Sequence, residues 1–121
     1  MPKPGVYFIV DLAIREGKLE AFQTIAENMV EGTQQEPGAL AYEFYFDSAQ
    51  ERCRLIEIYS ASDAALAHCK GRVVQELVPK LLEVSSLTGF SVYGDLSSEA
   101  AELLTQVGAQ LYSSSRGFNR F

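Results

Sequence analysis

The stretch from Glu36 to His68 constrains the fold of this chain more than any other. It reads as a Pro-Gly turn, a strand, a short polar loop, a second strand and the start of a helix. Over residues 40–46 and 53–59, alternate positions carry large apolar side chains, which is typical of β-strands. Because the loop over residues 47–51 is short and polar, we expect the two strands to form an antiparallel hairpin.

Strand and helix patterns also flank this hairpin. Alternation predicts a strand over residues 6–14, and apolar positions three and four apart predict a helix over 18–34, which Pro37 ends. A second helical stretch follows the hairpin from Ser60 or Ser62 to Leu82. Gly71 and Pro79 interrupt it, so we expect two shorter pieces or a kinked helix. With a fourth strand over 88–93, the order βαββαβ predicts an α+β, ferredoxin-like fold with an antiparallel sheet.

The chain continues beyond Gly94 with an extra unit. Ser97 or Ser98 is placed to cap a short helix, and residues 109–113 are expected to form a fifth strand. The tail over 114–121, which ends at Phe121, either covers a partner subunit or the mouth of a pocket, or is frayed. At 121 residues we expect one domain over 1–121, with a core over about 5–94 and an extension over about 95–121.

Composition excludes several classes of partner. The net charge is −6 and the basic residues are scattered, which argues against nucleic acid and anionic membranes. No apolar run approaches the ~18 residues of a membrane span, and the first residues do not resemble a signal peptide. Cys53 and Cys69 lack the spacing of a metal site or disulfide scaffold, so we expect reduced thiols and a cytoplasmic location.

The first two strands are apolar on both faces. Helices in this topology cover only one face of the sheet, and the other face would then expose an unusually large apolar patch. We therefore expect a homodimer in which two sheets pack face to face, with a small-molecule pocket between them. The alternative is that the C-terminal helix covers the second face.

Several short motifs resemble those of the antibiotic biosynthesis monooxygenase family. The resemblance covers roughly residues 5–94 and is carried by Glu36-Pro37-Gly38, Tyr42-Glu43, Glu57-Ile58-Tyr59 and Asp63-Ala64-Ala65-Leu66-Ala67-His68. It implies a homodimeric α/β barrel. Members of this family include cofactor-independent monooxygenases that act on quinols and polycyclic aromatics, and others that process phosphorylated autoinducers or degrade haem. Here Val73 stands where a second histidine is frequent, Tyr59 replaces a common tryptophan, and the lack of tryptophan disfavours haem degradation.

The resemblance and the residue chemistry together select four candidate site residues. His68, the only histidine, is the candidate catalytic base, because its ordinary pKa lies near neutrality; the alternative is an ordinary histidine on a helix face. Tyr42, Glu57 and Tyr59 are candidate substrate-binding residues. Core packing is the alternative for the tyrosines, and an interface ion pair with Arg54, Arg72 or Arg116 is the alternative for Glu57.

The expected function is that of a cofactor-independent monooxygenase acting on a small aromatic or quinol. The sequence contains no phosphate-binding loop, nucleophile elbow or metal-ligand motif, so we expect neither a metal nor an organic cofactor. An isomerase of small keto or hydroxy compounds is an alternative on the same fold. A non-catalytic small-molecule-binding or stress-related dimer is the alternative from another class.

Overall fold

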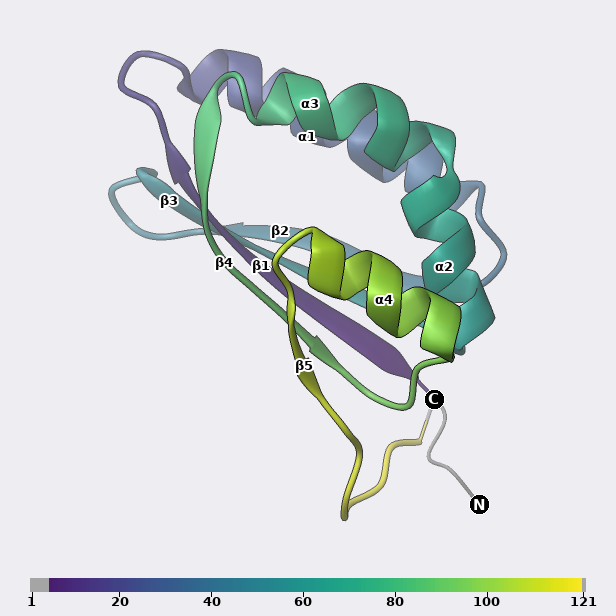
Figure 1. Cartoon of the computed structure of the whole chain (residues 1–121). Helices are drawn as coiled ribbons and strands as arrows, with labels where there is room; N and C mark the ends of the chain where they lie inside the picture. Colours follow the sequence, from purple (N-terminus) through teal and green to yellow (C-terminus); the bar gives the residue numbers. More distant parts are fainter. Residues whose placement is uncertain (1–4, 121) are drawn as a thin grey trace.

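The computed structural model describes residues 5–120 and has the predicted α+β, ferredoxin-like fold (Figure 1). Its elements are β1 (Val6–Ile14), α1 (Leu19–Gln34), β2 (Ala39–Phe46), β3 (Arg52–Tyr59), α2 (Ser62–Lys70), η1 (Val73–Leu77), α3 (Val78–Leu81), β4 (Ser85–Tyr93), α4 (Ser98–Gln106) and β5 (Gln110–Tyr112). The order of the first six predicted units is therefore confirmed, and so are the extra helix and strand beyond Gly94. The fourth strand begins three residues earlier than expected, because Ser85 and Ser86 still pair with the end of β1.

The five strands form one sheet in the order β2-β3-β1-β4-β5. The four core strands pair in antiparallel fashion, as predicted. β5 instead runs parallel to β4, so the complete sheet is mixed. The reason is that α4 connects these two strands, and a helical crossover returns the chain in the same direction.

The predicted break in the second helical stretch is also confirmed. α2 ends at Lys70 because Gly71 adopts an extended conformation. A turn of π-helix, η1, follows, and Pro79 then lies in the first turn of α3, where its missing N–H costs no helical hydrogen bond. The run therefore bends over the sheet in three short pieces.

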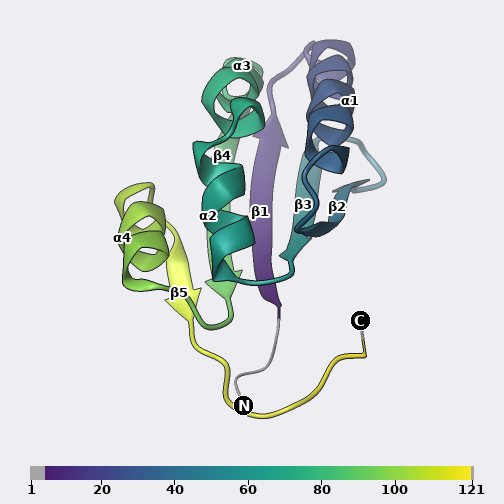
Figure 2. The same cartoon turned by 90° about the vertical axis from the view of Figure 1, so that its right-hand side faces the viewer.

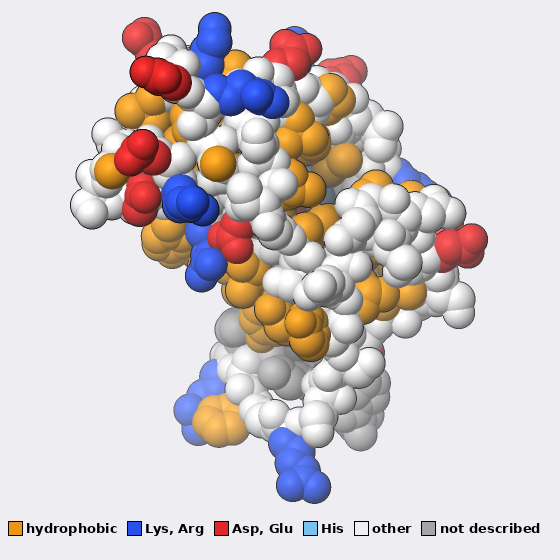
Figure 3. Space-filling model, turned by 60° about the vertical axis from the view of Figure 1, so that its left-hand side comes forward, with side chains coloured by type: hydrophobic (Ala, Val, Ile, Leu, Met, Phe, Trp, Pro, Cys, Tyr) orange, Lys and Arg blue, Asp and Glu red, His pale blue; other side chains and the backbone are white. Residues whose placement is uncertain are grey.

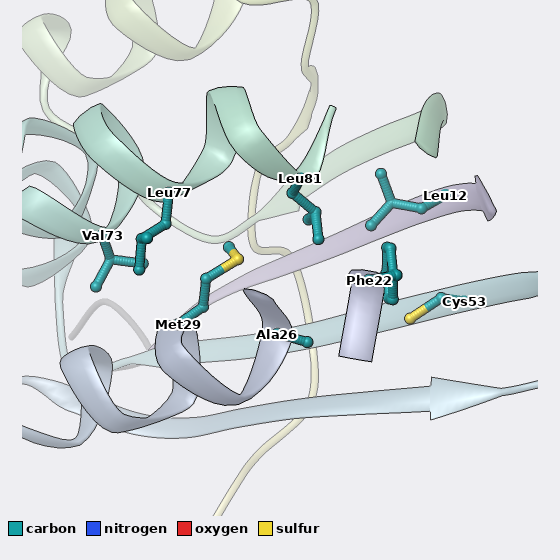
Figure 4. Packing of buried hydrophobic residues seen from close by; sticks show 8 residues of the cluster. All are labelled: Leu12, Phe22, Ala26, Met29, Cys53, Val73, Leu77 and Leu81. Atoms are coloured by element: carbon teal, nitrogen blue, oxygen red, sulfur yellow. The ribbon is translucent and has the colours of Figure 1, made fainter. Parts of the chain in front are cut away.

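All the helices lie on one face of the sheet (Figure 2). Between α1, the η1–α3 segment and the sheet, apolar side chains interdigitate (Figure 4). The buried members of this cluster are Leu12, Phe22, Ala26, Met29, Cys53, Val73, Leu77 and Leu81. A second cluster packs the end of the sheet where β1 starts against α2 and α4. Its buried members include Phe8, Tyr59, Ala65 and Leu104.

α4 lies beside α2 in the helical layer and not on the opposite face of the sheet (Figure 2). Ser97 caps it by accepting a hydrogen bond from Ala100 N, which confirms the predicted cap. The Ser97 N–H donates to Ser62 Oγ at 2.8 Å, and Lys70 pairs with Glu99 at 2.5 Å, which fixes α4 to α2. The alternative, in which this helix covers the second face of the sheet, is therefore wrong.

The second face carries a band of apolar side chains that no helix covers within residues 5–120. Cross-strand pairing places Tyr7 opposite Ile58 and Tyr93, and Ile9 opposite Ile56. Toward one end, Arg54 makes two hydrogen bonds to Asp11.

Leu40 does not belong to the face that the alternation of β2 predicted. The register of β2 against β3 shifts between Ala39 and Ala41, and Leu40 is left 50% exposed at this irregularity. A bulge of this kind moves one side chain out of the alternating pattern.

The C-terminal segment after β5 returns to the start of β1. There the Asn119 side-chain amide donates a hydrogen bond of 3.1 Å to the Tyr7 hydroxyl. This contact lies at one end of the uncovered face, so the segment is attached within its own chain at that point. The Phe121 end of the tail, for which the sequence predicted a role over a partner or pocket, lies outside the described residues.

Candidate functional site

An apolar cavity of about 320 Å³ lies between the sheet and the helices of a single chain. Phe8, Leu55 and Phe90 from the strands, Met29 from α1, and Val74 and Val78 from the helical run contribute to its lining. Its volume falls at the lower end of the range for small-molecule sites. We predicted a pocket between the sheets of two subunits, whereas this cavity lies on the other side of the sheet.

α4 and the residue that follows it form the outer wall of this cavity, through Leu103, Leu104 and Val107. Figure 3 shows apolar side chains gathered in the hollow between the upper helices and the lobe that contains α4. Val107, Leu82 and Leu87 line the cavity but remain 57%, 37% and 45% exposed. These three residues therefore mark the mouth of the cavity.

A cluster of polar side chains stands at the inner end of this cavity. Tyr42 from β2, Glu57 from β3 and His68 from α2 all contribute to the lining. His68 Nε2 lies 3.5 Å from Glu57 Oε1, and the Tyr59 hydroxyl donates a hydrogen bond of 2.5 Å to the same oxygen. The His68 ring lies between two tyrosines, with ring centroids 5.6 Å away in Tyr42 and 5.1 Å away in Tyr59.

Glu36 contacts the opposite nitrogen of His68. Its Oε1 lies 2.9 Å from Nδ1, at the turn that joins α1 to β2. Gly38 holds this turn close to α2, because a Cβ at position 38 would overlap the Cβ of Ala64, one helical turn before His68. Ser60 N–H also donates to Gly38 O at 2.9 Å. The Pro-Gly turn thus has a second role besides ending the helix: it presents Glu36 to His68.

Burial sets the protonation states of the two central groups. Desolvation raises the pKa of Glu57 to about 8, against the opposing effect of the Tyr59 hydrogen bond. Desolvation lowers the pKa of His68, and the neighbouring Glu36 only partly compensates. Near neutral pH the site therefore holds a protonated Glu57 carboxyl beside a neutral imidazole.

The other ionisable groups around His68 stay protonated. Desolvation, reinforced by the negative charge of Glu57, raises the pKa of both Tyr42 and Tyr59. Burial likewise raises the pKa of the Cys69 thiol, at the cavity wall, to about 12. The cluster consequently offers hydrogen-bond donors and one unprotonated base, and it offers no thiolate nucleophile.

The structure brings the four predicted site residues together. Tyr42, Glu57 and His68 line the cavity, whereas Tyr59 lies behind Glu57 and His68 and does not reach the cavity surface. His68 is only 2% exposed. Arg54 binds Asp11 and Arg72 binds Glu76, and Glu57 has Tyr59 and His68 as its neighbours.

Glu36 is the site residue that the sequence analysis missed. It was assigned to the turn that ends the first helix and to a motif of the family resemblance, and no role at the site was predicted for it. A carboxylate immediately after a helix C-terminus is electrostatically unfavourable, since the negative end of the helix dipole lies there. That misplacement was the available signal that Glu36 has a partner elsewhere.

Other classes of site are not visible in the part of the chain that the structure describes. Over residues 5–120, no group of three His, Cys, Asp or Glu side chains is arranged to hold a metal ion. No helix in the same range is long and apolar enough to cross a membrane. Both cysteines are free thiols.

Comparison with known structures supports the fold over most of the chain. MupZ from Pseudomonas fluorescens is 27% identical with a TM-score of 0.77, and the match covers 96% of this chain and 94% of MupZ. Rv0793 from Mycobacterium tuberculosis is 21% identical with a TM-score of 0.67, covering 78% of this chain and 97% of Rv0793. A structure named antibiotic biosynthesis monooxygenase is 24% identical with a TM-score of 0.64, over 72% and 92%.

Comparison of the sequence with family models identifies the family to which the chain belongs. No curated protein matches the chain. The family model described as "Antibiotic biosynthesis monooxygenase" matches residues 5–80, which include Glu36, Tyr42, Glu57, Tyr59 and His68. α4 and β5 lie beyond the matched range, although the alignment with MupZ extends over nearly the whole chain. This chain belongs to the antibiotic biosynthesis monooxygenase family.

Proposed function

We propose that the protein is a cofactor-independent monooxygenase that oxidises a small aromatic or quinol-type substrate inside the apolar cavity. The observation that carries the proposal is the composition of the cavity: apolar side chains on nearly every side, and Tyr42, Glu57 and His68 together at its inner end. Such a cavity accepts a flat, apolar ring. It also presents an acid and a base to a hydroxyl group on that ring.

His68 is the proton acceptor in this mechanism. Its Nε2 removes the proton of the substrate hydroxyl, and the resulting anion is electron-rich enough to reduce O₂ by one electron. The substrate radical and superoxide then combine to form a carbon–oxygen bond. Loss of water from this hydroperoxide, with protons from His68 and from the ring carbon, leaves the quinone. One oxygen atom thus enters the product and the other leaves as water.

Glu57 acts as a hydrogen-bond donor in the same step. A buried carboxyl that keeps its proton can stabilise the negative charge that develops on a substrate or peroxide oxygen. Tyr59, hydrogen-bonded to Glu57, holds the carboxyl in place, and Tyr42 packs its ring against His68 at the cavity wall. No step requires a metal or an organic cofactor, and we propose none.

The active form is a homodimer. The apolar band around Ile9, Ile56 and Ile58 has no covering element in the described chain, and a large exposed apolar patch favours association. Packing two such faces together would leave both cavities intact, because each lies on the other side of its sheet. A cytoplasmic location agrees with two free thiols.

The first experiment is oxygen uptake with a panel of hydroquinones and naphthols. We expect His68→Ala to lower turnover by about 10²–10⁴-fold, as for loss of a general base. Glu27→Gln, which changes an exposed carboxylate on α1 that does not line the cavity, is the control and should keep wild-type turnover. Full activity of the His68→Ala protein would contradict the mechanism.

An isomerase is the second candidate, and one observation favours it. Glu57 and His68 form an acid–base pair 3.5 Å apart, which also suits proton transfer between carbon and oxygen of a keto or hydroxy compound. Oxygen separates the two candidates: an isomerase converts its substrate under argon, and the proposed monooxygenase does not. Binding of these ligands without conversion in air or argon would indicate a non-catalytic binding protein.

A further inference from the structure

Glu36 reaches His68 from the side that faces away from the cavity. It lines a separate groove of about 450 Å³ at the junction of α1, β2 and α2, together with Gly38, Ala64 and Arg72. The groove and the cavity have no lining residue in common. His68 and Glu36 together therefore connect two hollows that are otherwise separate.

The contact between them determines which ring nitrogen carries the proton. A carboxylate only accepts hydrogen bonds, so Nδ1, 2.9 Å from Glu36 Oε1, must be the protonated nitrogen of the neutral ring. Nε2 is then left with its lone pair, 3.5 Å from Glu57 and at the cavity. The two side chains differ in access to water: His68 is 2% exposed and Glu36 is 28% exposed.

We propose that Glu36 is a positioning residue that fixes His68 in the tautomer with an unprotonated Nε2 toward the cavity, and that it exchanges the Nδ1 proton with water in the groove. This inference rests on the proposed role of His68 as proton acceptor. The inference adds Glu36, a residue outside the cavity, to the site. The substrate would enter through the cavity, and the proton would leave through the groove.

The proton transfers balance over a cycle. When Nε2 takes a proton from the cavity, the ring becomes an imidazolium, which the Glu36 carboxylate stabilises. The Nδ1 proton can then pass to Glu36 Oε1 and from there to water in the groove. The same path in reverse reloads Nδ1 before Nε2 returns its proton to the reacting oxygen, so the ring alternates between neutral imidazole and imidazolium. The cavity can thus stay dry while its base exchanges protons with solvent.

Five titratable side chains lie around His68. Glu36 faces Nδ1, Glu57 faces Nε2, Tyr42 and Tyr59 flank the ring, and Cys69 is its neighbour on α2. Glu57, the tyrosines and the thiol have raised pKa values and stay neutral at pH 7. Glu36 is therefore the group that can stabilise a charged imidazole.

Nitrogen NMR of the ¹⁵N-labelled protein without substrate tests the tautomer, because His68 is the only histidine and its two ring signals are unambiguous. We expect a protonated Nδ1 and an unprotonated Nε2 in the wild type. In Glu36→Gln, whose amide can donate or accept, the single tautomer should be lost and the midpoint of the His68 titration should shift downward. Glu36→Asp, which keeps a carboxylate, should recover part of the wild-type tautomer preference and part of the wild-type titration midpoint.

Glu76→Gln is the matched control, since it removes a carboxylate near the groove that pairs with Arg72 and does not touch His68. It should leave both His68 signals as in the wild type. A wild-type tautomer and titration in Glu36→Gln would overturn the proposal, as would a proton on Nε2 of the neutral wild-type ring.

Formate tests the route of the proton. In Glu36→Ala the groove has room for a small carboxylate, and added formate should speed the exchange of the Nδ1 proton with water as well as move the His68 titration back toward the wild-type midpoint. If formate has no effect, the proposed exchange route is wrong, and the positioning role of Glu36 is then decided by the tautomer measurement. If the protein shows the predicted tautomer but takes up no oxygen with any quinol, only the proposed function is contradicted.

Discussion

The Tyr59 hydroxyl donates a hydrogen bond of 2.5 Å to Glu57 Oε1, and both side chains are almost completely buried. Hydrogen bonding to a carboxylate normally favours the charged form. Here desolvation is the larger effect, and it raises the pKa of Glu57 to about 8. The pair therefore acts as a neutral donor network at pH 7, and the behaviour of the protein at different pH values should reveal it.

The stability of the protein should fall between pH 5 and pH 8.5 because of Glu57. The folded state binds a proton on Glu57 that the unfolded state, with an ordinary pKa near 4.5, releases. The stabilising contribution is thus complete below that value and is lost as pH rises through about 8. In Glu57→Gln this dependence should disappear. The difference in the free energy of unfolding between wild type and Glu57→Gln should therefore change by on the order of 2–4 kcal/mol from pH 5 to pH 8.5.

Urea unfolding at pH 5, 7 and 8.5 measures this change. His68 acts in the opposite direction, since its lowered pKa reduces stability as pH falls below the ordinary histidine value, and it remains in both proteins. Glu99→Gln, at an exposed site, should follow the wild-type curve. Parallel curves for wild type and Glu57→Gln would show that Glu57 is ionised in the folded protein.

The pH dependence of kcat/KM should be bell-shaped. Activity should rise on the acid side as His68 loses its proton, with a midpoint below the ordinary histidine pKa of 6.5. It should fall on the alkaline side near pH 8, where Glu57 ionises. In Glu57→Gln the alkaline limb should vanish while the acid limb stays. An unchanged alkaline limb in this variant would assign that limb to another group.

Gly38→Ala should damage the site without changing any of its polar side chains. The added methyl group would overlap Ala64, so the turn must move away from α2 and carry Glu36 with it. We expect a loss of about 1–3 kcal/mol in the free energy of unfolding, as for other overpacked sites, together with a lower His68 pKa in the NMR titration. Gly108→Ala is a control for the effect of a new methyl group, because that position has open space, although its positive φ adds some strain of its own. A Gly38→Ala protein with wild-type His68 titration would show that the turn tolerates the methyl group in place.

Sedimentation should give about twice the monomer mass of 13.3 kDa at micromolar concentration. Ile56→Glu, in the middle of the uncovered face of the sheet, should shift the protein to the monomer, because a charge there cannot be buried without a partner. Val107→Glu, immediately after α4 on the helical side of the sheet, should stay dimeric. A wild-type monomer would contradict association through the sheet.

Local periodicity predicted most of the fold. The alternation in the hairpin and in the first strand, and the spacing of apolar residues in α1, correspond to elements within a few residues of their observed bounds. The features that depend on partners distant in sequence were not predicted correctly or were not predicted at all. Leu40 left the expected face because of a register shift against β3. No direction was predicted for β5, which is parallel because α4 lies between it and β4.

The candidate site, like the fold, was predicted only in part. The sequence indicated Tyr42, Glu57, Tyr59 and His68 as separate candidates, yet the burial of His68 and its contact with Glu36 arise only when the turn before β2 packs on α2. The side of the sheet on which the cavity lies depends likewise on how far η1 and α4 stand from the strands. The spacing of residues in the sequence does not determine these distances between packed elements.

The position of α4 has a consequence for how proteins built like this one can diverge. The groups proposed to move protons lie within the span shared by the family, whereas the outer wall of the cavity comes from a segment after that span. Replacements at Leu103 or Val107 can therefore reshape the chamber while the inherited chemistry at its inner end stays untouched. Selection for new substrates and selection for an intact reaction centre would act on different parts of the gene.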